Sequence, residues 1–425
     1  MWSTLENIAI RESLPAPLKA GQSLYGILIS GQLNKGRHNL YYLGLRRSIP
    51  YQLKQFYSIS TDSFLCWQNE ARFIYMPQTS RYIWPCEEWR GGLIAPFPRG
   101  LSLSKWLQTE NLSTNKKLKI AAMLAREIAK LHSLNIIHRG LSPTCIHISD
   151  SNVSISNFGR AQYKFWDDFW ADSLMSPNDK AYVSPECLKG YCGDEKDDIY
   201  SFGAILHIIL ANKPAFGPLK QILRITFPRL IEPNTLTTTN DIPKKVIELI
   251  SACLSSSPAN RPLMDEAVST LSEFCVQPLT EIEKITIPNK ESAPNRKKIM
   301  VFIKNDNCAV SLFDSVLQKA SETPSAFLFV GLIPCNLPSG DAERFKGNLF
   351  KKLAHGLMRC REKKLLWSLR VLENIDPAKA AVELIRQYQP DLVLIGRSAK
   401  NTKTIFRKKF CTELEAENIT VESIH

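Results

Sequence analysis

Short apolar segments alternate with longer amphipathic ones throughout residues 298–425, and this alternation limits the folds open to that part of the chain. The apolar segments have strand length, and the amphipathic segments have the three- and four-residue spacing of helices. Strands separated by such helices pair in parallel. We therefore predict a doubly wound parallel α/β domain, with strands at 298–304, 326–334, 367–372, 391–396 and 419–423 and helices at 310–320, 341–362, 377–388 and 403–416.

A charged segment, residues 276–297, separates this domain from the part of the chain before it. The segment holds three prolines and has no sustained apolar period, as expected of a linker. Before it, residues 21–97 contain several strand-like runs and one helix, whereas residues 98–275 are mostly helical. This order predicts an α+β unit with two lobes, preceded by an N-terminal extension at residues 1–20.

Charge and cysteine spacing exclude several functions. The formal net charge is +13, but the excess is spread over both parts of the chain, so we predict no nucleic-acid partner. The basic run at Lys403 and residues 407–409 has helical spacing and is interpreted as a solvated face. The eleven cysteines form no C-x-x-C pair, so we expect reduced thiols and no metal site.

Membrane and phosphate-binding signals are also weak. No apolar run approaches the roughly 20 residues of a membrane span, and the first residues do not resemble a signal peptide. We therefore expect a cytoplasmic protein with no membrane partner. Only 19 of the 425 residues are glycine, and phosphate-binding loops need several glycines close together.

Five short motifs occur in a fixed order in the helical part of the chain. The first motif resembles the catalytic loop of protein kinases. The second resembles their D-F-G segment, the third their A-P-E segment, and the last two resemble later segments of the same family. The motifs are IIHRGLSPTCIHI at 136–148, SNFGR at 156–160, YVSPE at 182–186, DIYSFG at 198–203 and NRP at 260–262. Lys54, in YQLKQFY, resembles the lysine of the V-A-I-K strand, and Glu70 resembles its partner on the following helix. Residues 20–275 therefore resemble a bilobal protein kinase.

The residues that carry chemistry in that family are replaced here. Gly140 stands where protein kinases have the catalytic aspartate, which orients the substrate hydroxyl. Ser142 replaces a lysine that helps the transferred phosphate. Cys145 and Asn157 replace two Mg²⁺ ligands, and neither a thiol nor a neutral amide matches the carboxylate-rich oxygen set that this hard cation prefers. Loss of a general base alone costs about 10²–10⁴ in rate, so the replacements predict a pseudokinase.

The stretch that corresponds to the phosphate-covering loop of protein kinases also differs from the family pattern. It reads GQLNKG at 31–36, with two glycines where the family pattern G-x-G-x-x-G has three. Backbone amides in this stretch would not close on a phosphate as that pattern requires. We therefore interpret residues 31–36 as part of an ordinary hairpin.

The residues that support the kinase fold, in contrast, match the family. The resemblance implies an ion pair between Lys54 and Glu70, which either holds the α- and β-phosphates or only docks the helix onto the sheet. It also implies a buried pair between Glu186 and Arg261, which can persist without catalysis because removing one partner leaves an unpaired charge. The remaining matching positions are Asp198, expected to brace the backbone around His138 and Arg139, and Phe158, expected to join the lobes together with His138.

Residues 298–425 resemble the universal stress protein family in the order of their strands and helices. The resemblance is strongest at 375–398, IDPAKAAVELIRQYQPDLVLIGRS, where Asp376 is expected to cap a helix. Nucleotide-binding members continue with further glycines, but none follows Gly396, so the candidate ligand site is reduced to Gly396 and Asp306. The last strand is a sheet edge, which either pairs two chains into a homodimer or is covered by the kinase-like domain.

These observations predict a catalytically degenerate kinase homologue joined to a universal-stress-protein-like domain and acting as a regulatory scaffold or sensor with protein partners. One alternative is an atypical, weakly active ATP-dependent Ser/Thr protein kinase that uses Lys54. Another is a ligand- or nucleotide-sensing stress-response module. The sequence predicts no metal and leaves ATP without Mg²⁺ as the only candidate cofactor.

Overall fold

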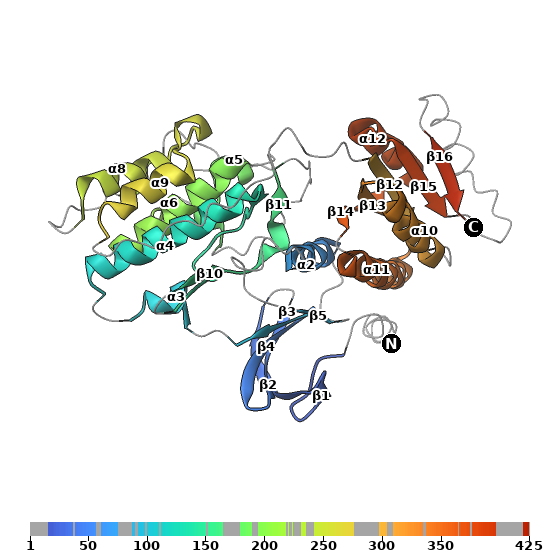
Figure 1. The fold of residues 1–425 in the computed structure, drawn as a ribbon, viewed down its shortest axis with the longest axis horizontal. Helices are drawn as coiled ribbons and strands as arrows, with labels where there is room; N and C mark the ends of the chain where they lie inside the picture. Colours follow the sequence, from blue (N-terminus) through green and yellow to red (C-terminus); the bar gives the residue numbers. More distant parts are fainter. Residues whose placement is uncertain are drawn as a thin grey trace. The chain divides into compact units, whose positions relative to one another are not determined.

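The computed structural model describes residues 16–36, 39–56, 61–74, 87–89, 92–97, 100–109, 112–149, 152–164, 179–188, 194–217, 220, 223, 231–234, 242–275, 297–303, 309–334, 337–363, 365–374, 376–396 and 420–424. The chain divides into two compact units (Figure 1). The first comprises Met1–Met76, Glu87–Ile94 and Pro288–His425, and the second comprises Pro77–Cys86 and Ala95–Ile287. The N-terminal sheet and the C-terminal domain therefore belong to one unit, although the second unit separates them in the sequence.

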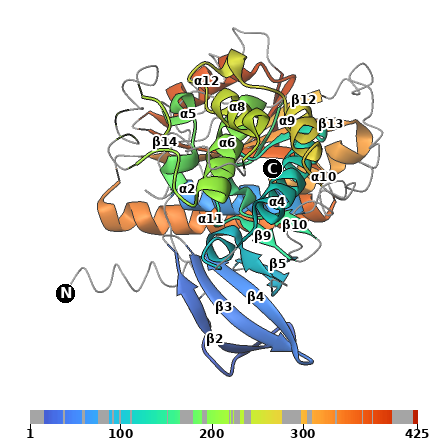
Figure 2. The same ribbon diagram turned by 90° about the vertical axis from the view of Figure 1, so that its left-hand side faces the viewer.

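A six-stranded sheet forms the N-terminal part of the first unit. Its strands lie in the order β1 (Ser23–Leu24), β2 (Ile27–Lys35), β3 (Asn39–Arg46), β4 (Ile49–Phe56), β6 (Gly92–Pro96) and β5 (Glu87–Trp89). The pairs β1–β2, β2–β3, β3–β4 and β5–β6 are antiparallel, and Figure 2 shows β2, β3 and β4 side by side. Apolar residues alternate along β2 and β3, which gives the sheet one buried face. Helix α2 (Thr61–Ile74) follows β4.

The C-terminal domain contains the predicted parallel sheet. Its strands lie in the order β14 (Leu366–Asn374), β13 (Ser325–Pro334), β12 (Lys297–Ile303), β15 (Leu392–Gly396) and β16 (Val421–Ile424), and every neighbouring pair is parallel. Helices α10 (Ala309–Glu322), α11 (Ser339–Glu362) and α12 (Pro377–Tyr388) connect them. The prediction of a parallel α/β sheet is confirmed, while the helix expected at 403–416 lies outside the described residues.

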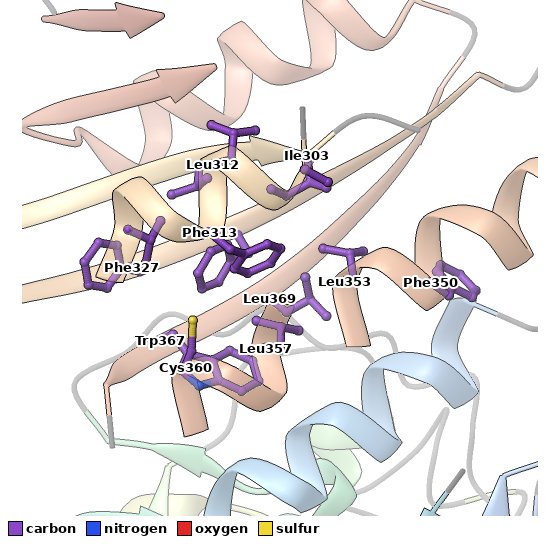
Figure 3. Close-up of a cluster of buried hydrophobic side chains, with 14 of the residues drawn as sticks. Ile303, Leu312, Phe313, Phe327, Phe350, Leu353, Leu357, Cys360, Trp367 and Leu369 are labelled. Carbon is purple, nitrogen blue, oxygen red and sulfur yellow. The ribbon is translucent and has the colours of Figure 1, made fainter. Parts of the chain in front are cut away.

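The sheet is covered on both faces, as a doubly wound domain requires. Along β12, Val301 belongs to a core with α10 and α11, whereas Phe302 belongs to a second core with α12. Figure 3 shows the first core, in which Phe313 of α10 and Leu353 of α11 are labelled. The same core includes Phe64 and Trp67 of α2, so α2 shares its apolar packing with the C-terminal domain.

Helix α6 (Glu195–Ala211) of the second unit is largely buried and packs against α4 (Thr114–Ser133) and α8 (Lys244–Cys253), and α9 (Met264–Ser272) packs against α4 and α8. Within the described part of the chain, no helix combines the length and apolar content that crossing a membrane requires. The shorter elements are β7 (Leu101–Ser102), α3 (Leu103–Trp106), β8 (Ile136–Ile137), β9 (Ile146–Ile148), β10 (Val153–Ile155), η1 (Phe158–Arg160), β11 (Gln162–Tyr163), η3 (Asp179–Tyr182), α5 (Pro185–Leu188) and η4 (Pro258–Asn260).

Candidate functional site

The loop that follows β8 is held in place by a carboxylate on α6. The backbone amides of His138 and Arg139 donate to Asp198 Oδ2 and Oδ1 at 2.7 and 2.8 Å, and His132 Nε2 donates to the same carboxylate at 3.0 Å. Burial alone would raise the pKa of Asp198, but hydrogen bonds and charge from His132 and His138 outweigh it and hold that pKa below its usual value. Asp198 thus stays ionised and fixes the start of the loop.

His138 also connects this loop to the segment around η1. Its imidazole lies edge-on to the Phe158 ring, with centroids 4.8 Å apart, and its Nε2 donates to the backbone carbonyl of Ser156 at 3.0 Å. Both side chains are buried. The sequence-predicted pair of His138 and Phe158 is therefore brought together inside the second unit.

Gly140 sits in the middle of the loop, beside Arg160. A Cβ atom added at Gly140 would lie 3.4 Å from Arg160 Cδ and 3.9 Å from His138 Nδ1, which are ordinary contacts. The backbone at Gly140 therefore accepts a side chain, and glycine is not required there by strain. The methylene stem of Arg160 packs against the side of the loop from which an acidic side chain would project.

Ser142 and Cys145 interact with each other rather than presenting side chains for phosphate chemistry. The Cys145 thiol donates to the Ser142 carbonyl at 3.1 Å and accepts from the Ser142 amide at 3.2 Å. Ser142 Oγ contacts Thr144 Oγ1 at 2.9 Å. Cys145 is 1% exposed, so its sulfur contributes to the turn of the loop and is a poor ligand for Mg²⁺.

Asn157 precedes η1 and adopts the left-handed conformation, with φ 65° and ψ 51°. Asparagine tolerates this region better than most residues, so a neutral amide satisfies the backbone here. A carboxamide adds no negative charge for a divalent cation. Among the described residues, no group of three or more His, Cys, Asp or Glu side chains could hold a metal ion.

Glu186 and Arg261 form the predicted ion pair in the second unit. The Arg261 guanidinium donates to both Glu186 carboxylate oxygens, with Nη2 to Oε2 at 3.1 Å, and also to the Ser255 carbonyl at 2.9 Å. Burial would raise the pKa of Glu186, but the hydrogen bond and charge of Arg261 lower it below the usual value. The sequence motifs did not indicate the neighbouring Asp197, whose pKa is raised to about 7, mainly by burial.

Lys54 and Glu70 form the predicted strand–helix ion pair in the first unit. Lys54 Nζ on β4 donates to Glu70 Oε2 on α2 at 2.6 Å, and the side chains are 16% and 12% exposed. Nearby, Gly31 pairs with Leu43 in the β2–β3 hairpin, and the Gly36 amide donates to the Asn39 carbonyl at 2.8 Å. Gly31 therefore lies in the antiparallel β2–β3 pair and Gly36 directly follows β2, in agreement with the interpretation of residues 31–36 as hairpin residues.

The candidate ligand site of the C-terminal domain is only partly described. Gly396 ends β15, whereas Asp306 and the basic run at Lys403 lie outside the described residues. The predicted cap is confirmed, because the Asp376 carboxylate accepts from the Lys379 amide at 3.2 Å and Pro377 begins α12.

A cavity of about 590 Å³ lies in the second unit beside Pro143, in the loop that follows β8. The ammonium of Lys117, on its wall, donates to the Leu210 carbonyl at 3.2 Å. The cavity's further lining residues are Ser104, Leu107, Gln108, Thr109, Leu112, Tyr182, Ile208 and Asn212.

Comparison with known proteins relates part of this sequence to protein kinases. A family model for protein tyrosine and serine/threonine kinases matches residues 85–271. A putative serine/threonine-protein kinase/receptor of Acanthamoeba polyphaga mimivirus is 29% identical over 172 residues, which cover 39% of this chain and 10% of that protein. A probable LIM domain-containing serine/threonine-protein kinase of Dictyostelium discoideum is 31% identical over 160 residues, which cover 37% of this chain and 16% of that protein.

A probable serine/threonine-protein kinase of Clostridium acetobutylicum is 26% identical over 223 residues, covering 48% of this chain and 33% of that protein. The matched part of the chain thus spans a third or less of these relatives' length. The matched residues contain the loop around Gly140, the η1 segment and the Glu186–Arg261 pair. The chain therefore contains a protein-kinase-like domain.

Proposed function

We propose that this chain is a regulatory kinase homologue that does not transfer phosphate, in which a universal-stress-protein-like domain acts as a sensor or scaffold. The observation that carries the proposal is the loop around Gly140, which has an anchored backbone but no side chain for general-base or metal chemistry. Phosphoryl transfer depends on positioning and on charge neutralisation by metals. Both contributions are reduced by the residues at these positions.

The relatives bear the names of serine/threonine kinases, but those names describe proteins of which this chain matches only a part. The four positions that carry the chemistry in protein kinases are occupied here by Gly140, Ser142, Cys145 and Asn157. Loss of the general base alone costs about 10²–10⁴ in rate. Loss of the two metal-binding positions removes charge stabilisation as well, so we expect no measurable turnover.

The proposed relation of the C-terminal domain to universal stress proteins is supported by its all-parallel sheet, in which β12 lies at the centre. In sheets of this kind, ligands bind beyond the carboxyl ends of the strands where the strand order reverses. Gly396 ends β15, the strand that pairs with β12 on one side of this point. We place a sensed ligand there, and protein partners of signalling or stress response on the kinase-like domain.

Nucleotide titration tests the loss of metal-dependent chemistry. A ligand at about 100 times its dissociation constant stabilises the protein that binds it by about 2.7 kcal/mol, which raises Tm by several degrees. We expect ATP with Mg²⁺ to raise Tm no more than ATP alone does. We also expect no radiolabelled phosphate to reach the chain itself or a generic basic protein. Either a magnesium-dependent rise or phosphate transfer would contradict the proposal.

One observation favours a second function, a weakly active or purely ATP-binding domain. The Lys54–Glu70 pair is formed at 2.6 Å, and in protein kinases this pair holds the lysine that contacts ATP phosphates. A Tm rise with ATP that Lys54→Met abolishes would support nucleotide binding at this pair. Lys244→Met is the matched control, because Lys244 is an exposed lysine of the second unit.

We also propose a homodimer formed through β16, the last strand at one end of the described sheet. Strand edges carry unpaired backbone groups that can pair with a second chain. Light scattering of the full chain checks the mass, and Ser423→Pro, which removes a backbone amide on the side of β16 that faces away from β15, is expected to return a dimer to monomers. A monomer at all concentrations would contradict this proposal.

A further inference from the structure

Helix α2 is buried on more than one side. Phe64, Gln68 and Arg72 follow one another at four-residue steps, so they lie along one face of the helix. Glu70 lies two residues from both Gln68 and Arg72, which at about 100° per residue turns it to the other side. One face of α2 therefore carries Glu70 toward Lys54, while another carries the stripe of three residues.

The C-terminal domain contacts each residue of this stripe. The Phe64 ring stacks on Phe350 of α11, with centroids 4.1 Å apart and an interplanar angle of 3°, and Figure 3 shows Phe350 on the α11 segment beside α2. Arg361 Nη1, also on α11, donates to Gln68 Oε1 at 2.9 Å. These contacts bind the first and second positions of the stripe to a single helix of the C-terminal domain.

The third position contacts β14. Arg72 Nη1 donates to the backbone carbonyl of Trp367 at 2.9 Å. The guanidinium carbons of Arg72 and Arg361 lie 5.8 and 5.9 Å from the centre of the Trp367 ring. The Trp367 ring is therefore within range of a cation–π interaction with one arginine from α2 and one from α11.

Burial makes these polar contacts specific. Gln68, Arg72 and Arg361 are 0%, 2% and 1% exposed. A buried polar group that loses its partner costs more than the bond contributes, so only a narrow range of positions of α2 keeps the hydrogen bonds from Arg361 to Gln68 and from Arg72 to Trp367. Apolar packing alone, by contrast, is non-directional and would tolerate sliding of the helix.

We propose that the C-terminal α/β domain positions α2, and through it holds Glu70 against Lys54, with Gln68, Arg72 and Arg361 as positioning residues for that pair. A ligand that shifts α11 or β14 then alters the Lys54–Glu70 pair, and by linkage a ligand at Lys54 alters the C-terminal domain to the same extent. The proposal rests on the place of this pair in the proposed kinase-like site, but it does not depend on the loss of phosphate transfer.

Acylation of lysine amines in the full chain tests the coupling. A small N-hydroxysuccinimide ester modifies free amines, and mass spectrometry of the digest gives the rate at each lysine. Lys319 serves as the internal reference, because it is paired with Glu422 at 2.7 Å within the C-terminal domain. The ratio of the Lys54 rate to the Lys319 rate reports local release, since global unfolding would expose both amines.

We expect Arg361→Met to raise this ratio by about tenfold, the change that follows from losing a charge-assisted hydrogen bond. Glu70→Gln, which weakens the Lys54 contact directly, defines the value for a released amine. Arg359→Gln is the matched control, because Arg359 lies on the same helix but pairs with Asp314 at 2.6 Å; its ratio should equal that of the wild type.

A double variant separates positioning from packing. Gln68→Leu combined with Arg361→Met removes both polar partners, so no buried amide is stranded, and we expect the ratio to stay raised, because apolar packing alone lets the helix slide. Arg361→Lys is a milder change that can be measured in the same way if the methionine variant does not fold. We expect its ratio to lie between those of the wild type and Glu70→Gln. A wild-type ratio in a folded Arg361 variant would overturn the proposal. An unchanged ratio in Glu70→Gln would overturn it too, because the pair would then not protect Lys54.

Discussion

Asp198 anchors two backbone amides next to Gly140, so the loop keeps its conformation without a side chain at its chemical position. A Cβ at Gly140 would meet only ordinary contacts, and the Cys145 thiol is bonded within its own turn. At the scale of single residues, the groups that hold the loop backbone in place are thus different from the side chains that would carry out chemistry on it. Because of this separation, Mg²⁺ ligands can be introduced at Cys145 and Asn157, the two positions that resemble the metal-binding positions of protein kinases, without disturbing the anchored backbone.

We expect the double variant Cys145→Asn, Asn157→Asp to acquire a magnesium-dependent rise in Tm with ATP. The new carboxylate and amide oxygens supply the ligands that Mg²⁺ prefers. A site filled to about 100 times its dissociation constant corresponds to about 2.7 kcal/mol, read by a thermal-shift titration. Cys253→Asn, at another buried thiol, is the control for nonspecific effects. Identical curves with and without Mg²⁺ in the folded double variant would count against the assignment of these two positions.

His147 gives the loop region a pH dependence. Burial lowers the pKa of His147 to about 4, whereas an unfolded histidine titrates near pH 6.5. The contribution of the neutral imidazole is therefore fully present above pH 6.5 and is lost as the pH falls toward 4, by roughly 3 kcal/mol. We expect His147→Gln to lose less unfolding free energy than the wild type between pH 7 and pH 4.5 in urea titrations. Parallel losses in the two proteins would show that His147 is not the group that titrates.

At the scale of elements, close approach decides how α10 and α11 pack. Gly356 lies on α11 where a Cβ atom would be 2.1 Å from Phe313 Cε2 of α10. The ring of Phe313 is buried and stacks on Phe329 of β13, with centroids 5.1 Å apart. The helix pair is therefore held at a distance that only glycine permits, and α11 in turn presents Phe350 and Arg361 to α2.

We expect Gly356→Ala to lower the free energy of unfolding by about 1–3 kcal/mol through overpacking, even though alanine is favoured over glycine by about 1 kcal/mol in a helix. Chemical denaturation of the full chain measures the change. Gly217→Ala is the control, because no atom lies within 4 Å of the added Cβ there, and it should differ little from the wild type. A more stable Gly356 variant would mean that α10 and α11 can separate without cost.

At the scale of the whole molecule, the compact units do not follow the order of the sequence, because the first unit combines segments from both ends of the chain. The N-terminal sheet, α2 and the C-terminal domain form one unit around a shared core, while the kinase-like motifs from the catalytic loop onward belong to the other. The boundaries predicted at residues 97, 275 and 297 remain predictions. The shared core nevertheless implies that the C-terminal domain is part of the environment of the Lys54–Glu70 pair.

We expect fragments 1–275 and 297–425, expressed together as separate chains, to copurify. Burying a large apolar side chain contributes about 1.5–3 kcal/mol, and Phe64, Trp67 and Phe350 are all buried in the shared core. Affinity capture of one fragment followed by gel analysis measures the association. Phe350→Asp should abolish it, whereas Val310→Asp, at a position 60% exposed, should leave it intact. Fragments that never associate would show that the linker, and not the core, joins these parts.

The sequence by itself determined the parallel α/β domain, because the alternation of apolar and amphipathic segments is a local property that dictates which elements form. It also determined which chemical residues are replaced, since Gly140 and Asn157 stand within short motifs. Only the tertiary structure decided that α2 packs against α11 and β14 through Arg72, Arg361 and Trp367. The hydrogen-bonded pairs Arg72–Trp367 and Gln68–Arg361 are separated by 295 and 293 positions in the sequence, and no local periodicity records which distant surface a helix face will bury. The burial that makes their hydrogen bonds specific exists only after the chain has folded.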